Sequence, residues 1–265
     1  MPVISKKGLI YTVKSGDTLY AIASRFGSAV DAIERANHLY PPVTDRGLIF
    51  PDDVLAIPTS TSNPIISHIV TNGDTLMAIA QTFNTYVDLL AGVNNISNPN
   101  LISVGQSLVV PAFTYRIVSG DTLYSIARRF GVSVAEIEEA NADRPGFQRD
   151  VIWPDYHLII PIPTSRNIFV TRPLPDSSFN SGDKVEGYAR VFEAVVTFQL
   201  RDRNGVVVSN ERFAMTDKGA PAYGFFSSTV PFDRQPTSSS GELWVYSRSA
   251  KDGSIQDLVK IKVNF

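Results

Sequence analysis

Apolar and polar residues follow the same order three times along the N-terminal part of the chain. Each unit opens with a short segment of β-branched and aromatic residues, such as Tyr11-Thr12-Val13, which favours a β-strand. Apolar residues then fall at i, i+3, i+4 and i+7, which predicts a helix with a buried stripe. The stripe is Leu19, Ile22, Ala23 and Phe26 in unit one, Leu76, Ile79, Ala80 and Phe83 in unit two, and Leu123, Ile126, Ala127 and Phe130 in unit three.

A second helix and a last strand complete each unit. A hydroxyl residue followed three positions later by an acid has the spacing of a capping box and predicts the helix start. These motifs are Ser28-x-x-Asp31, Thr85-x-x-Asp88 and Ser133-x-x-Glu136. Because asparagine tolerates the left-handed conformation, Asn37, Asn94 and Asn141 are predicted to end these helices. Apolar runs that end in proline, residues 55–58, 108–111 and 158–161, predict the last strands.

The string Gly-Asp-Thr-Leu lies between the first strand and the first helix of every unit. Its aspartates are 57 and then 47 positions apart, which is the spacing of small modules rather than of helical hairpins. The glycine allows a tight turn, and the aspartate is predicted to cap the helix that follows. The three turns are Gly16-Asp17-Thr18-Leu19, Gly73-Asp74-Thr75-Leu76 and Gly120-Asp121-Thr122-Leu123.

The whole pattern, Tyr-x-Val-x-Ser-Gly-Asp-Thr-Leu-Tyr-x-Ile-Ala, then Asn, then Leu-Ile-x-Pro-x-x-x-Leu-x-Ile-Pro, resembles the LysM domain. Three such units cover residues 9–58, 67–111 and 114–162. The resemblance implies a βααβ fold for each unit. It also implies binding of polymers that contain N-acetylglucosamine, either peptidoglycan or chitin, in a groove between the Gly-Asp-Thr-Leu turn and the loop that enters the last strand.

That loop supplies the second wall of each groove. Free amides at a helix start can meet an acetamido carbonyl while apolar side chains cover its methyl group. The second walls are Leu48, Ile49, Phe50 and Pro51 in unit one, Leu101, Ile102, Ser103 and Val104 in unit two, and Val151, Ile152, Trp153 and Pro154 in unit three.

Some of these residues have two interpretations. The turn alone is sufficient to explain the glycines, and the aspartates are interpreted as caps rather than as direct sugar ligands. Phe50 and Trp153 are either ligand contacts or packed loop aromatics. Because Ser103-Val104 replaces the aromatic–proline pair, unit two is predicted to bind more weakly than units one and three.

Insertions and connectors also distinguish the units. The second wall begins 11 positions after the helix-ending asparagine in unit one and 10 positions after it in unit three, against 7 in unit two. The insertions, residues 38–47 and 142–150, are expected to narrow or extend the groove. Residues 59–64 predict a flexible or extended connector, whereas the short segment 112–114 is expected to hold units two and three in a fixed relation.

Beyond residue 165 short alternating segments replace the helical pattern. They predict seven strands, at residues 168–171, 184–189, 195–202, 206–215, 225–230, 242–249 and 258–265, and hence an antiparallel β-sandwich. The motifs Arg172-Pro173, Val185-x-Gly187-x-Ala189 and Ser249-x-x-Asp252-Gly253-Ser254 resemble the immunoglobulin-like domain of bacterial spore germination proteins. That resemblance covers residues 167–265 and implies a location in the spore cortex, spore coat or cell envelope.

Composition narrows the partners of the chain. A formal net charge of -2 argues against a nucleic-acid partner, and the absence of cysteine excludes disulfides and thiolate metal sites. No run is long enough to span a membrane, and residues 1–9 lack the apolar segment of a signal peptide. A signal has therefore been removed, or the protein reaches its site without one.

The sequence predicts a noncatalytic protein, without cofactor or metal, that binds peptidoglycan or chitin oligosaccharides. No pair of acids has a glycosidase pattern, and His38, His68 and His157 lack metal-ligand spacing. His68 stands where units one and three have tyrosine, so it is interpreted as a packing substitute. One alternative is a scaffold whose residues 167–265 recruit a spore envelope protein. A less favoured alternative is a peptidoglycan hydrolase.

Overall fold

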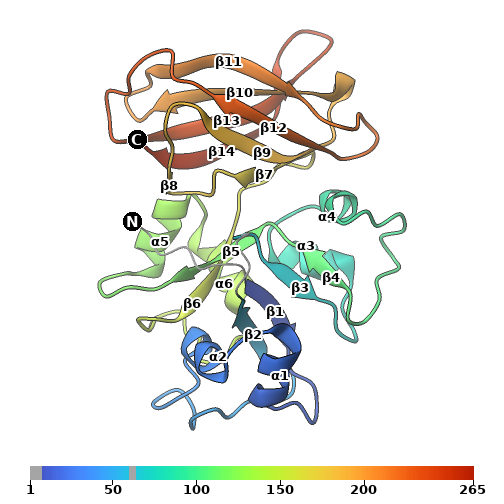
Figure 1. The fold of residues 1–265 in the computed structure, drawn as a ribbon, viewed down its shortest axis with the longest axis vertical. Coiled ribbons are helices and arrows are strands. Elements are labelled where there is room, and N and C mark those ends of the chain that lie inside the picture. The colour runs from blue at the N-terminus through green and yellow to red at the C-terminus, as the bar shows by residue number, and fades with distance from the viewer. Residues whose placement is uncertain (1–7, 60–63) are drawn as a thin grey trace.

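The computed structural model describes residues 8–59 and 64–265, which form three small units and an all-β C-terminal unit (Figure 1). Unit one contains β1 (Gly8–Thr12), α1 (Leu19–Phe26), α2 (Val30–Asn37) and β2 (Val54–Pro58). Unit two contains β3 (Ser67–Ile69), α3 (Leu76–Thr82), α4 (Val87–Val93) and β4 (Ser107–Val109). Unit three contains β5 (Ala112–Arg116), α5 (Leu123–Phe130), α6 (Val134–Asn141) and β6 (His157–Pro161). The predicted βααβ order is confirmed in all three units.

The apolar stripe of the first helix is buried as its spacing predicts. All four stripe residues of α3 and of α5 are buried, and in α1 only Phe26 is half-buried. Each stripe belongs to a buried apolar cluster that also contains residues of the second helix and of the last strand of its unit. Since these units contain no cysteine, apolar burial of this kind is their main source of stability.

The first helix is capped by the threonine of the turn, not by the predicted aspartate. Thr18 has an extended backbone, and its hydroxyl accepts a hydrogen bond from the amide of Ala21 at 3.1 Å. Thr75 and Thr122 cap α3 and α5 in the same way. The prediction was wrong by one residue, because the aspartate precedes the cap position and bonds elsewhere.

The capping box predicted for the second helix exists only in unit three. There the Ser133 hydroxyl and the Glu136 carboxylate satisfy each other's backbone amides at the start of α6. In units one and two, Ser28 and Thr85 lie one residue before the cap position, so α2 and α4 have no side-chain cap. The Ser28 hydroxyl instead donates to the carbonyl of Pro58 at 2.6 Å.

The asparagine near the end of the second helix links the helix to the last strand. The Nδ2 group of Asn37 donates to the carbonyls of Ile33 and Ala56, and its Oδ1 accepts from the amide of Ala56 at 2.8 Å. Asn37 ends α2 as predicted, but the left-handed residue is the next one, His38, with φ 51°. Equivalent bonds join Asn94 to Leu90 and Val109, and Asn141 to Ile137 and Ile159.

Units one and two share a four-stranded sheet in the order β2-β1-β3-β4. Its central strands β1 and β3 run parallel, with Leu9 opposite Ser67 and Ile10 opposite His68. The connector predicted at 59–64 lies largely outside the described residues, as does most of segment 1–9, where no signal was predicted. The pairing of β1 with β3 fixes the two units to each other.

The two insertions pack against each other between units one and three, and the expected narrowing or extension of the groove stays a prediction. Arg144 of the second insertion is buried, and it donates to Oδ1 of Asn141 at 2.8 Å and to Oδ1 of Asn37 at 3.0 Å. A Cβ atom at Gly146 would lie 2.8 Å from Cγ1 of Val43 in the first insertion. Arg144 therefore joins the two helix-ending asparagines across the interface.

The C-terminal unit contains a five-stranded sheet, β11-β10-β13-β14-β8, and a three-stranded sheet, β12-β9-β7. All seven predicted segments contain a strand, and the two-residue strand β8 was not predicted. One buried cluster includes Phe169, Phe198 and Phe226, so both sheets contribute to the same core. The strands are β7 (Ile168–Arg172), β8 (Ser177–Ser178), β9 (Asp183–Ala189), β10 (Val195–Asp202), β11 (Val207–Met215), β12 (Gly224–Val230), β13 (Ser240–Arg248) and β14 (Ile255–Asn264).

The C-terminal unit rests on units two and three, while unit one lies at the opposite end of the molecule (Figure 1). The ring of Tyr223 packs on Gly92 of α4, where a Cβ atom would lie 2.0 Å from it. The Tyr223 hydroxyl donates to the carbonyl of Arg166 at 2.7 Å, and the Arg166 guanidinium binds Asp88 of α4 at 2.7 Å. Unit two is thus joined both to unit one and to the C-terminal unit.

Candidate functional site

The turn of unit one is held by its aspartate. Oδ2 of Asp17 accepts hydrogen bonds from the hydroxyl of Tyr11 at 2.6 Å and from the amide of Lys14 at 2.8 Å. Gly16 has φ 86°, a conformation that glycine adopts without steric cost. Burial, and then the Asp17 carboxylate, raise the pKa of Tyr11 to about 12, so the tyrosine stays a donor. These bonds fix the turn and leave its outer surface to solvent.

Unit three repeats this arrangement and unit two replaces its tyrosine. Tyr115 donates to Oδ2 of Asp121 at 2.6 Å, whereas in unit two Nε2 of His68 lies 2.8 Å from Oδ2 of Asp74. The interpretation of His68 as a packing substitute is therefore confirmed. Burial pushes the pKa of Asp74 upward, but the hydrogen bonds from His68 and Thr71 outweigh burial and hold that pKa below its usual value.

Two backbone hydrogen bonds bring the second wall to the turn in every unit. In unit one the amide of Asp52 donates to the carbonyl of Val13, and the amide of Val13 donates to the carbonyl of Asp53, both at 2.9 Å. Val13 lies three positions before Gly16 of the turn, and Asp52 directly follows the second wall. The same pairing joins Gly105 and Gln106 to Val70, and Asp155 and Tyr156 to Ile117. The structure thus places both predicted walls at the same end of each unit.

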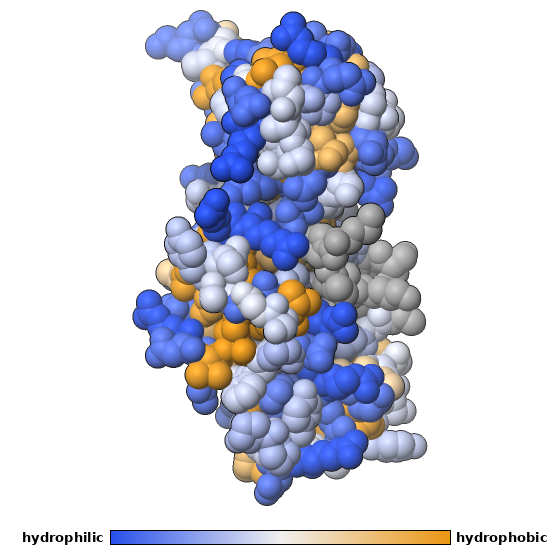
Figure 2. All heavy atoms as spheres, turned by 90° about the vertical axis from the view of Figure 1, so that its left-hand side faces the viewer, coloured by the Kyte–Doolittle hydropathy of each residue, from blue (hydrophilic) through white to orange (hydrophobic). Residues whose placement is uncertain are grey.

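Large apolar side chains are exposed along these walls. The exposed fractions of Leu48 and Phe50 are 41% and 55%, and that of Leu101 is 72%. The others are Tyr20, Met77, Val104, Val118, Tyr124 and Val151. Figure 2 shows a hydrophobic patch on the units below the C-terminal unit, on a face that is otherwise largely polar or intermediate. A turn whose glycine and threonine are exposed, beside exposed apolar side chains, can bind a neutral, acetamido-bearing sugar.

Family comparison agrees with this geometry. The LysM domain model matches residues 11–58, 68–111 and 115–161, which together make up more than half of the chain. The chain belongs to the LysM family. A second model, the immunoglobulin-like domain of bacterial spore germination, matches residues 167–254. Both resemblances predicted from the sequence are therefore confirmed.

Similarity to individual proteins is partial. The chain is 37% identical over 124 residues to the secreted LysM effector ECP6 of Passalora fulva, covering 40% of this chain and 54% of the effector. It is 32% identical over 111 residues to the probable autolysin SsaALP of Staphylococcus aureus, and the match covers 38% of this chain and 40% of the autolysin. The spore cortex-lytic enzyme SleL of Bacillus cereus matches at 39% identity and a TM-score of 0.30, covering 38% of this chain and 22% of SleL. The chain spans about half or less of the length of these proteins.

Trp153 is placed differently from the other aromatic of the second walls. Phe50 of LysM unit one is exposed, but Trp153 of unit three is half-buried and stacks on His38, with the ring centroids 5.0 Å apart. His38 belongs to the insertion of unit one, so Trp153 contributes to the interface between two LysM units. Of the two interpretations left open by the sequence, packing applies to Trp153 and ligand contact remains available to Phe50.

Sequence reasoning missed two features of the LysM walls. Tyr20, Met77 and Tyr124 directly follow the Gly-Asp-Thr-Leu strings and are 78%, 62% and 70% exposed. The signal was present, because an apolar residue outside the i, i+3, i+4, i+7 stripe faces away from the core. The second is the left-handed residue after each second wall, Asp52, Gly105 or Asp155, which turns the chain back toward the first strand.

Membrane-spanning and metal-binding features are absent from the part of the chain that the structure describes. Within residues 8–59 and 64–265, no helix has both the length and the apolar character that a membrane span requires. The same residues contain no cluster of three or more histidines and acids placed to hold a metal ion.

Proposed function

We propose that this protein is a noncatalytic binder of polymers that contain N-acetylglucosamine, with peptidoglycan as its main ligand and chitin oligosaccharides as analogues. Membership of the LysM family supports recognition of such glycans. The spore-germination domain supports a location in the spore cortex, spore coat or cell envelope. Its two sheets contribute to one core, which supports a β-sandwich as the fold of the C-terminal unit.

One observation carries the proposal. In each unit backbone hydrogen bonds join the segment before the Gly-Asp-Thr-Leu turn to the segment after the second wall. The leucine of each turn is buried, contrary to its predicted place in the groove, but the residue directly after the turn and at least one apolar side chain of the second wall remain exposed. Exposed apolar groups cost free energy in water, and the acetamido methyl and the C–H face of a sugar can cover them. The neutral character of these walls suits an uncharged glycan.

The aspartates of the turns support a binding role rather than a hydrolytic one. A glycosidase acid must keep its proton, so its pKa is raised. The pKa of Asp74 is lowered instead, since the bonds from His68 and Thr71 outweigh burial. Asp17 and Asp121 are engaged in the same way by a tyrosine and a backbone amide.

Three sites on one chain allow avidity. Strand pairing joins unit one to unit two, and Arg144 joins unit one to unit three, so the spacing of the turns is fixed. Tandem weak sites strengthen binding by roughly 10² to 10⁴ when the polymer engages them together. A long glycan strand is therefore expected to bind more tightly than a short oligosaccharide.

Calorimetric titration of the intact protein tests this proposal. Chitotetraose and purified muropeptides at millimolar concentration should each produce saturable heat, and long glycan strands should bind at lower concentration. A peptidoglycan-containing gel should show no clearing. Absence of binding to every glycan would contradict the binding function, and clearing of the gel would contradict the noncatalytic assignment.

A scaffold function is the second candidate. It is favoured by two apolar side chains on β11 of the C-terminal unit, Phe213 and Met215, whose exposed fractions are 73% and 69%. In that case Phe213→Ser with Met215→Ser would abolish recovery of an envelope protein while glycan binding is unchanged. Unaltered recovery would count against the scaffold function.

A further inference from the structure

A charged cavity lies between unit three and the C-terminal unit. It has a volume of 540 Å³, and its walls come from the end of α5 and from β10, β13 and β14. Five cationic side chains line it, against three acids, so its local charge is opposite in sign to the net charge of -2 of the chain. The cations are Arg128, Arg129, Arg201, Arg203 and Lys262.

The three acids are already engaged by other groups. Both oxygens of Asp202 accept hydrogen bonds from backbone amides and from Thr237. Asp176 accepts from Arg129 at 2.6 Å and from Asn264 at 2.9 Å. Glu242 accepts a hydrogen bond from the indole N–H of Trp244 at 2.9 Å, and its carboxylate lies 3.6 Å from the Lys260 ammonium. That ammonium lies 4.3 Å from the centroid of the Trp244 ring. Asp176 and Glu242 therefore offset Arg129 and Lys260, whereas Asp202 is held by neutral donors and keeps its negative charge.

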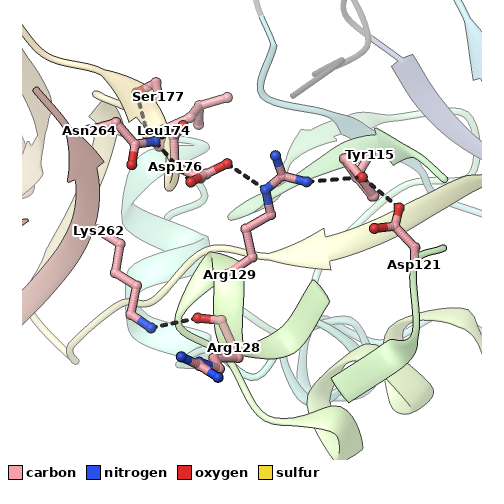
Figure 3. Close-up of polar contacts among 9 residues, drawn as sticks. All are labelled: Tyr115, Asp121, Arg128, Arg129, Leu174, Asp176, Ser177, Lys262 and Asn264. Carbon is pink, nitrogen blue, oxygen red and sulfur yellow. Dashed lines mark hydrogen bonds and ion pairs between the residues drawn. The ribbon is translucent and has the colours of Figure 1, made fainter. Parts of the chain in front are cut away.

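Four of the five cations are not paired with a carboxylate, so their charge is available to a ligand. Within residues 8–59 and 64–265, Arg128, Arg201, Arg203 and Lys262 form no ion pair with a carboxylate. The Lys262 ammonium donates to the backbone carbonyl of Arg128, which holds the two sides of the cavity together (Figure 3). Arg201 lies over the Trp244 ring, 4.5 Å from its centroid. These four unpaired cations outnumber the single unpaired acid, Asp202, so the cavity attracts a ligand that carries negative charge.

The same helix connects this cavity to the turn of unit three. α5 begins directly after the cap residue Thr122 and ends at the cavity, and its eight residues span about 12 Å at 1.5 Å per residue. Figure 3 shows Arg129 reaching from α5 to Asp176 on one side and to Tyr115, which holds Asp121, on the other. A peptide of four residues spans about 13 Å when extended, which matches this distance.

We propose that the cavity binds the carboxylates of a peptidoglycan stem peptide whose glycan occupies the turn of unit three. Stem peptides carry acidic residues and a terminal carboxylate, whereas chitin carries no charge. The guanidinium groups of Arg128 and Arg203 suit carboxylates because they can donate two parallel hydrogen bonds. This proposal rests on the glycan-binding function, and it makes the C-terminal unit the part of the chain that selects peptidoglycan over chitin.

The test compares a muropeptide with the same glycan after removal of its stem. The variant Arg128→Gln with Arg203→Gln removes two exposed charges that make no ion pair, and the control Arg234→Gln with Lys251→Gln removes two exposed charges outside the cavity. In the unaltered protein the stem should strengthen binding about tenfold, as two charge-assisted contacts supply roughly 1.4 kcal/mol. The cavity variant should lose this tenfold gain, and the control should keep it.

Binding of the stem-free glycan separates the two proposals. If it binds and the stem adds nothing, or if the cavity variant retains the gain, the cavity proposal is overturned while the glycan-binding function stands. If inorganic phosphate or sulfate competes as strongly as the muropeptide, the cavity is a general anion site and the assignment to stem peptides is overturned. If no glycan binds, the binding function fails first.

Discussion

Unit two has the same fold as units one and three, but its surroundings differ from theirs. The turn of unit two uses His68 in place of a tyrosine, its loop is the shortest, and its α4 helix is covered by the C-terminal unit. Unit one instead lies at the far end of the molecule and exposes Phe50. The hydrogen bonds that form the turn are retained in all three units, while the surrounding surfaces differ. In this comparison units two and three each contact both unit one and the C-terminal unit, and unit one offers the most open binding surface.

The largest effect is expected at the arginine that joins units one and three. Arg144→Met would leave the Oδ1 atoms of Asn37 and Asn141 without that donor, so the free energy of unfolding should fall by about 3 kcal/mol. Urea denaturation measures this change. Arg149→Met, in the same insertion, removes an exposed arginine and should cost less than about 1 kcal/mol. Equal losses in the two variants would mean that Arg144 does not hold the interface.

A second substitution addresses the contact between unit two and the C-terminal unit. Gly92→Ala would place a Cβ atom 2.0 Å from the Tyr223 ring, and this overpacking should lower the free energy of unfolding by about 2 kcal/mol. Thermal and urea unfolding report the loss. Arg35 occupies the equivalent position of exposed α2, so Arg35→Ala is the matched control and should cost at most about 0.5 kcal/mol. A neutral Gly92→Ala would show that the two units are not packed together.

Much of this architecture could be predicted from the sequence. The helical stripes and the last strands follow from local periodicity, and these elements agree with the structure to within a few residues. The cap residue was misplaced because Asp17 and Thr18 are both good caps, and only the bond from Tyr11 to Asp17 distinguishes them. The parallel pairing of β1 with β3 and the buried position of Arg144 depend on contacts between units, which no local pattern encodes.

The same limit applies to the candidate site. Its two walls were predicted correctly as neighbours, since the resemblance to LysM fixes their place in the unit. The sequence did not distinguish exposed Phe50 from Trp153, because the stacking partner of Trp153 is His38 in another unit. The exposed Tyr20 could have been found from its position outside the helical stripe.

Glycan affinity should differ between the second walls of units one and two. Phe50→Ala removes an exposed aromatic and should weaken chitotetraose binding by about tenfold, whereas Val104→Ala should weaken it by about twofold, in proportion to the apolar area lost. Calorimetry on both variants provides the measurement, and Phe213→Ala on β11 is the control, with no change expected. The ranking would be reversed if unit two dominated binding.

The smallest effect concerns acid titration of unit two. The pKa of Asp74 is depressed in the folded protein, so its stabilising contribution is present above the unfolded value near 3.8 and is lost as the pH falls through the folded pKa. His68→Phe removes one hydrogen bond to the Asp74 carboxylate and should raise the pKa of Asp74. The chemical shift of the Asp74 carboxyl carbon, recorded as a function of pH, measures this change. Asp88, whose pKa is held low by Arg166, should titrate unchanged and serves as the internal control. An unaltered Asp74 titration would show that His68 does not hold the turn.

The central claim is that the Gly-Asp-Thr-Leu turns and their second walls bind glycan, with unit one as the most open site. Amide chemical shifts of Gly16, Gly73 and Gly120, recorded while chitotetraose is added, test it most directly. All three amides should shift, and Gly16 should reach half-saturation at the lowest ligand concentration. Shifts confined to residues away from the turns, or none at millimolar ligand, would contradict the claim.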